Sequence, residues 1–166
     1  MKKIDSFKID HTKFGRGIYI SRIDNVQDTE IVTFDVRVKI PNKEEAMSSA
    51  VMHTIEHLGA TFLRNSKIKE NVIYFGGMGC LTGFYMILKN ENIDVKQPLF
   101  VRDLVRDLFM FVSSFKGEIP GATEVECGNY KLHDLDGAIN LARQFLKEVI
   151  LRSPDPTLLY TDKQHL

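Results

Sequence analysis

The sequence predicts an α+β fold, in which one domain carries a mainly antiparallel sheet with helices packed on one of its faces. First, the 166 residues are 43% apolar and 27% charged, a composition typical of a globular domain with its own core. Second, short alternating segments typical of half-exposed strands occur along the same chain as longer stretches with apolar residues every three or four positions. Third, no repeat, low-complexity tract or polar linker divides the chain. We therefore expect one domain over residues 1–166, with a peripheral tail after about residue 152.

Two strands are expected first, over residues 17–24 and 30–40. In the second strand, apolar residues such as Val32, Phe34 and Val36 alternate with polar ones. Because successive side chains of a strand point to opposite faces, these apolar residues should share the face that packs on the core.

Three helices should pack against this sheet. Asn42, followed three residues later by Glu45, resembles an N-terminal capping signal and predicts a helix over residues 46–64. A second helix should follow Pro98 through residue 115, where apolar residues recur every three or four positions, and a third should span residues 136–151.

Two further strands are expected over residues 71–75 and 82–89, on either side of the turn GGMGC. Its glycines, Gly76, Gly77 and Gly79, are able to take backbone angles that other residues avoid. A glycine-rich turn between two strands also holds a side chain, here that of Cys80, rigidly while leaving it accessible.

Charge and cysteine content exclude several kinds of partner. Lys and Arg together number 22, as do Asp and Glu, so no overall field attracts nucleic acid or an anionic membrane. The N-terminal residues contain no apolar run suited to a signal peptide or a membrane span, which predicts a cytoplasmic protein. In that reducing compartment the only two cysteines, Cys80 and Cys127, should be free thiols that react or bind metal rather than a disulfide.

The clearest chemical motif is H-x-x-E-H, formed by His53, Glu56 and His57 within the first predicted helix. Histidines four residues apart project from one face of a helix and can bind one divalent cation. Glu56 between them can accept a proton from a metal-bound water or from a carbon acid whose carbonyl the metal polarises.

A third ligand must come from elsewhere in the chain, and Cys127 is the best candidate. Two imidazoles with a thiolate leave one position open for substrate, as a catalytic site requires. His133, Glu124 and Glu126 are rival ligands. The ligand types suit zinc, and they are also compatible with a ferrous ion. A nearby cation would lower the pKa of Cys80 and make it a usable acid or base.

Several separated segments share their order and spacing with one known family. They are DSF with DHT (5–12), FDVRVKIPN (34–42), HTIEHL (53–58), MGCLTGFY (78–85), and ECGNY with HDL (126–135). Over residues 5 to about 151 the chain resembles the S-ribosylhomocysteine lyases of bacterial autoinducer synthesis. The family needs a histidine pair, a cysteine after a turn and a second cysteine further on, and all are present.

The resemblance implies a reaction and a set of residue roles. A metal-assisted carbonyl migration and β-elimination would convert S-ribosylhomocysteine to homocysteine and 4,5-dihydroxy-2,3-pentanedione, the autoinducer-2 precursor. It implies a homodimer with active sites at the interface, each holding a ferrous ion that zinc or cobalt can replace. The residues that take the family's positions are His53, His57 and Cys127 as ligands, Glu56 and Cys80 as acid/base groups, and Ser6, His11 and Arg37 in the substrate pocket.

The chain departs from the family pattern near Cys80. Leu81 stands where the family usually has arginine, Tyr74 where it has aspartate, and Gly76 and Gly77 where it has serine and proline. Two alternatives therefore stay open. One is a metal-binding homologue whose lyase activity is lost or altered, and the other is an H-x-x-E-H metallopeptidase that uses a glutamate as its third ligand.

Overall fold

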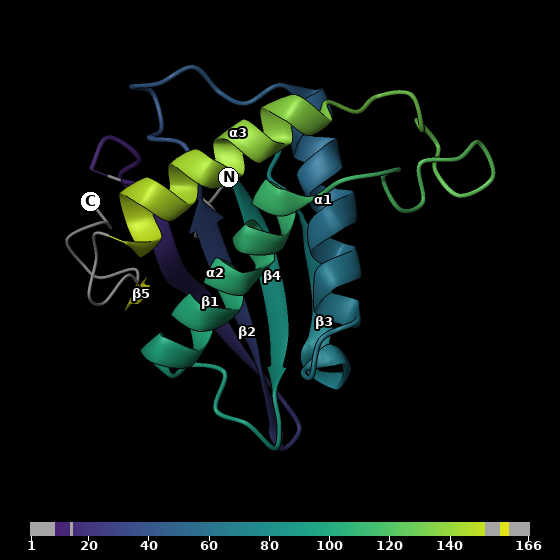
Figure 1. Ribbon diagram of the computed structural model, residues 1–166. Coiled ribbons are helices and arrows are strands. Elements are labelled where there is room, and N and C mark those ends of the chain that lie inside the picture. The colour runs from purple at the N-terminus through teal and green to yellow at the C-terminus, as the bar shows by residue number, and fades with distance from the viewer. Residues whose placement is uncertain (1–8, 14, 152–156, 160–166) are drawn as a thin grey trace, which may run out of the picture.

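A five-stranded sheet forms the centre of the computed structural model, which describes residues 9–13, 15–151 and 157–159 (Figure 1). The strands lie in the order β3-β4-β2-β1-β5. Their bounds are Gly17–Val26 (β1), Thr29–Arg37 (β2), Val72–Gly77 (β3), Gly83–Asn90 (β4) and Thr157–Leu159 (β5). The first four pair antiparallel, and β5 pairs with β1 in parallel. The predicted α+β class with a mainly antiparallel sheet is confirmed.

The helices lie on one side of this sheet, as expected (Figure 1). They are α1 (Ser49–Arg64), α2 (Pro98–Ser114) and α3 (Leu135–Phe145), with single turns η2 (Lys69–Asn71) before β3 and η3 (Leu146–Ile150) after α3. Helix α1 packs against β3, and α2 packs against both other helices. Within the described residues no helix combines the length and the apolarity that crossing a bilayer requires.

The core lies between the sheet and the helices. Val32, Phe34 and Val36 of β2 are at most 1% exposed, which confirms the predicted core face of that strand. From the helices, Leu58 of α1 and Phe109 of α2 are fully buried against them. Burying one such side chain stabilises the fold by about 1.5–3 kcal/mol. This packing fixes α1, and therefore the H-x-x-E-H motif, against the sheet.

The predicted start of the first helix is wrong by several residues. The N-cap is Ser48, whose Oγ accepts a hydrogen bond of 3.1 Å from the backbone N–H of Val51. Asn42 instead adopts a left-handed backbone conformation with φ 60°. That conformation suits a turn after β2 rather than a helix N-terminus.

The expectation for the glycine-rich turn is also wrong in detail. Gly76 and Gly77 belong to strand β3, and the left-handed residue of the turn is Leu81, with φ 59°. The two glycines are required for space instead. A Cβ on Gly76 would overlap the ring of Tyr74, and a Cβ on Gly77 would overlap Met52 of α1.

Strand β5 was not predicted, because its three residues lie in the expected peripheral tail. It extends the sheet along β1. The rest of that tail, residues 152–156 and 160–166, lies outside the described residues.

Candidate metal centre

Four potential metal ligands, all half-buried, converge beside α1. His53 and His57 come from successive turns of that helix, while Cys127 and His133 come from the segment between α2 and α3. One ligand atom from each of the four lies within 4.8 Å of the other three. The structure therefore brings together the three predicted ligands and one of their rivals.

Backbone carbonyls orient the two helical histidines. Nδ1 of His53 lies 2.8 Å from the carbonyl oxygen of Leu132, and Nδ1 of His57 lies 2.7 Å from that of Pro120. A carbonyl oxygen can only accept, so each Nδ1 carries the proton and donates it. Both Nε2 atoms consequently present lone pairs, as metal-bound histidines require.

The sulfur of Cys127 completes a donor set that suits a transition metal. Its Sγ lies 3.3 Å from Nε2 of His53 and accepts a 3.4 Å hydrogen bond from the backbone N–H of Asn129. Imidazole nitrogen and thiolate sulfur together favour ions such as zinc or ferrous iron over magnesium or calcium. The side chains present therefore fit the predicted metal.

His133 belongs to this centre, whereas the two rival glutamates do not. Its ring stacks on that of His53 with centroids 4.3 Å apart, and it meets the ring of His57 edge-on. Burial lowers the pKa of His133, and the charges of the other two histidines lower it further. Glu124 and Glu126 are exposed and lie outside the ligand group. The metallopeptidase alternative thereby loses its third ligand.

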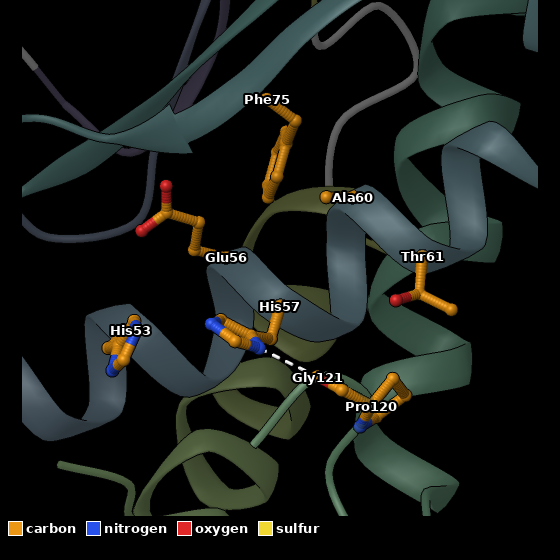
Figure 2. Close-up of a pocket in the computed structure, with 8 residues that line it drawn as sticks. All are labelled: His53, Glu56, His57, Ala60, Thr61, Phe75, Pro120 and Gly121. Carbon is orange, nitrogen blue, oxygen red and sulfur yellow. Dashed lines mark hydrogen bonds between the residues drawn. The ribbon is translucent and has the colours of Figure 1, made fainter. Parts of the chain in front are cut away.

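A cavity of about 380 Å³ opens beside the cluster, and Glu56 lines it (Figure 2). Figure 2 shows Glu56 projecting from α1 on the side of Phe75, next to the two helical histidines. The lining residues are His53, Glu56, His57, Ala60, Thr61, Phe75, Pro120 and Gly121. A small polar molecule held in this cavity would contact the Glu56 carboxylate and the metal ligands together.

Cys80 lies in the turn between β3 and β4, where a buried arginine reaches it. Nη1 of Arg37 is 3.6 Å from Sγ and also donates to the hydroxyl of Thr82. Because Thr82 accepts from Arg37, its own proton is available to Sγ, 3.1 Å away. The other end of the guanidinium pairs with Asp35, which is fully buried.

These contacts favour the ionised form of Cys80. Burial by itself raises the pKa of the thiol, but the hydrogen bonds from Thr82 and the positive charge of Arg37 bring the pKa below its usual value. Arg37 thus places a positive charge beside the thiol, whereas Leu81 adds none.

The remaining predicted residues have separate outcomes. Ser6 lies outside the described residues. His11 is half-buried, and its Nδ1 donates to the carbonyl of Ile9 over 2.9 Å, so its place in a substrate pocket stays a prediction. Leu81 packs against the core, whereas Tyr74 is 45% exposed on β3.

Sequence reasoning missed three supporting side chains. Thr54 is buried beside the histidines, and Thr82 and Asp35 hold Arg37. The alternation along residues 30–40 predicts that Asp35 and Arg37 lie on the face opposite the core. It does not predict that the two side chains are buried there as a pair.

Comparisons with known proteins give one consistent result. Residues 4–155 match the sequence pattern of the family described as S-ribosylhomocysteinase (LuxS). A protein of Phocaeicola vulgatus is 46% identical over 165 residues, covering 99% of this chain and all of the relative. One from Desulfotalea psychrophila is 48% identical over 161 residues, covering 96% and 99%, and one from Finegoldia magna is 46% identical over 162 residues, covering 98% and 100%. All three relatives are named S-ribosylhomocysteine lyase.

Proposed function

Because this chain belongs to the S-ribosylhomocysteinase (LuxS) family, we infer that it is an S-ribosylhomocysteine lyase whose reaction takes place at the cluster on α1. The observation that carries the inference is the convergence of His53, His57 and Cys127 beside a cavity lined by Glu56. The substrate is S-ribosylhomocysteine, and the products are homocysteine and 4,5-dihydroxy-2,3-pentanedione.

In the proposed reaction, the metal, Glu56 and Cys80 have different roles. His53, His57 and Cys127 would hold a divalent ion, which would supply a Lewis acid for the sugar carbonyl. Glu56 faces the cavity and removes and returns protons at the sugar carbons as the carbonyl moves along the chain. Cys80, whose thiolate form Arg37 and Thr82 favour, serves as the second proton carrier.

The identity of the metal is a further part of the proposal. We propose ferrous iron as the native ion, replaceable by zinc or cobalt, because two imidazoles and a thiolate accept all three. Aerobically purified protein should then carry zinc or a mixture of metals, since zinc has no redox chemistry and ferrous iron in an open site oxidises. Elemental analysis of aerobically and anaerobically purified protein measures this difference.

We also propose a homodimer in the cytoplasm. Strand β3 is an edge of the sheet and exposes two neighbouring apolar side chains, Ile73 and Tyr74, which a second copy would cover. In the arrangement that the family resemblance implies, Ser6 and His11 reach the pocket from the partner. The two free cysteines fit a reducing compartment.

Homocysteine release, followed with a thiol reagent over many turnovers, tests the proposed function. Glu56→Gln and Cys80→Ala should keep the metal and the fold but lose at least about a hundredfold in rate, because each removes a proton carrier and not a ligand. Glu70→Gln, on the exposed turn after α1, is the matched control and should keep the wild-type rate. Metal-loaded wild-type protein that releases no homocysteine would instead support the homologue without lyase activity.

A further inference from the structure

The side chain of Tyr74 occupies the space above a glycine of its own strand. Tyr74 and Gly76 are two residues apart in β3, so both face the same side of the sheet. A Cβ on Gly76 would overlap Oη and Cζ of Tyr74, which places the hydroxyl end of the phenol where a side chain at position 76 would be. A serine there, as the family usually has, would displace the phenol. The two departures from the family pattern therefore form one structural unit.

Glu56 comes level with this unit from helix α1. The helix lies along β3, where an added Cβ on Gly77 would overlap Met52 and an added Cβ on Gly59 would overlap the ring of Phe75. Glu56 follows Met52 by one helical turn and precedes Gly59, so it lies between these two contacts. The phenol covers the same stretch of β3. Figure 2 shows the carboxylate of Glu56 extending on the side of Phe75.

The electrostatics agree with this placement. Burial raises the pKa of the Tyr74 phenol, and the negative charge of Glu56 raises the pKa further. The phenol is consequently protonated at neutral pH and is able to donate a hydrogen bond. Its hydroxyl is hydrogen-bonded to none of the residues that the structure describes, and Tyr74 is 45% exposed. A molecule bound beside Glu56 is therefore able to reach this hydroxyl.

We propose that Tyr74 is a specificity-determining residue, whose hydroxyl donates a hydrogen bond to an oxygen of the substrate's sugar chain beside Glu56. This inference rests on the proposed function, in which Glu56 moves protons at the carbons of that chain. The sugar chain fits because most of its carbons carry an oxygen that accepts a hydrogen bond. Tyrosine supplies this donor without charge, whereas the family's usual aspartate would place a second negative charge near Glu56. Gly76 contributes by leaving the space for the phenol.

Steady-state kinetics of homocysteine release by Tyr74→Phe provide the first test. This variant keeps the ring that a second copy would cover and removes only the hydroxyl. KM should rise about three- to tenfold, which corresponds to one hydrogen bond between uncharged groups. The value of kcat should stay within about twofold, because the contact is equally strong in the bound substrate and in the transition state.

Ile73→Val, at the neighbouring exposed position of β3, is the matched control and should keep the wild-type KM. A Tyr74→Phe protein with the wild-type KM would overturn the inference and leave the proposed function intact. Wild-type protein that releases no homocysteine would instead overturn the proposed function itself.

A double-mutant cycle with Gly76→Ser tests the structural unit. The added side chain should displace the phenol and raise KM by about as much as Tyr74→Phe does. In the Tyr74→Phe background the same change should add little to KM, because the hydroxyl contact is already absent. Urea unfolding identifies any variant that is not folded. Effects on KM that add fully in the folded variants would show that the two positions do not act through one hydroxyl.

A substrate analogue without the amino group of the homocysteine part tests the assignment to the sugar chain. Tyr74→Phe should raise KM for this analogue by the same factor as for S-ribosylhomocysteine, because the sugar chain is unchanged. Equal KM values of the wild type and Tyr74→Phe for the analogue would assign the hydroxyl to the amino group and overturn the contact with the sugar.

Discussion

The thiol of Cys80 allows a sharp test of the site's electrostatics, because a buried guanidinium lies beside it. Nη1 of Arg37 lies 3.6 Å from Sγ, and the same nitrogen donates to Thr82. Arg37→Gln removes the positive charge and keeps a side chain that is able to donate hydrogen bonds. We expect the pKa of Cys80 to rise and the thiolate population near neutral pH to fall.

The size of the effect follows from this distance. Two unit charges 3.6 Å apart attract by roughly 1 kcal/mol in bulk water and by roughly 4–5 kcal/mol at an effective dielectric constant of 20. Because Sγ is only partly buried, we expect the attraction between the two charges to lie near the lower end of this range, at about 1–2 kcal/mol. The thiolate population at a fixed pH below the pKa should then fall by about five- to thirtyfold.

The assay is the pH dependence of iodoacetamide alkylation, read peptide by peptide because Cys127 is also a free thiol. Arg37→Gln alone leaves the buried Asp35 without its counter-charge, and breaking a buried pair costs about 3–5 kcal/mol. The double variant Asp35→Asn with Arg37→Gln avoids this penalty. Its Cys80 alkylation profile should show the same shift toward alkaline pH. Arg16→Gln, which breaks ion pairs with Glu44 and Glu148, is the control. An alkylation profile of Cys80 that is identical in all the folded variants would refute the reasoning.

The ionisation of Cys80 should also change the free energy of unfolding. The pKa of Cys80 is lower in the folded protein than the usual thiol value, so the thiolate stabilises the fold above that usual value. This contribution is lost as pH falls through the folded-state pKa. Urea unfolding of wild type and Cys80→Ala should therefore show a difference in free energy that grows with pH across this window. A difference independent of pH would contradict the assignment.

Three further outcomes are expected. Cys127→Ser should lose the metal and Glu126→Gln should keep it, as elemental analysis will show; the reverse result would restore a glutamate-ligand site. Gly59→Ala should destabilise the protein by about 1–3 kcal/mol in urea unfolding, because its Cβ would overlap the ring of Phe75. Gly79→Ala, where an added Cβ meets no atom within 4 Å, should be affected much less. Sedimentation should show a dimer in the active protein, and an active monomer is incompatible with a pocket completed by the partner.

The elements of the fold were predictable wherever one face of an element is apolar. The alternation in β2 identified its buried residues because a strand with one core-facing side has only one register that buries them. The start of α1 was missed because capping signals are short, and Asn42 and Ser48 are both good capping residues. Only tertiary contacts decide between them. Strand β5 is too short for any periodicity to show.

In the candidate site too, residues close together in the sequence were predictable, whereas contacts between distant segments were not. His53, Glu56 and His57 form a motif within one helix, so spacing alone revealed them. Cys127 lies 74 residues from His53 and was inferred from ligand chemistry rather than from position. The membership of His133 depends on how the segment after α2 folds back against α1, which no local pattern encodes.

The pairing of β2 with β4 sets when Cys80 acquires its reactivity during folding. Arg37 stands opposite Gly83 in that register, which brings the guanidinium to a cysteine 43 residues away in the chain. Contacts between such distant segments form slowly, because a long loop must close first. Until then the thiol has an ordinary pKa and reacts slowly with oxidants, since susceptibility follows thiolate character. During synthesis and early folding, the Cys80 thiol therefore lacks the contacts that favour its thiolate form in the folded protein.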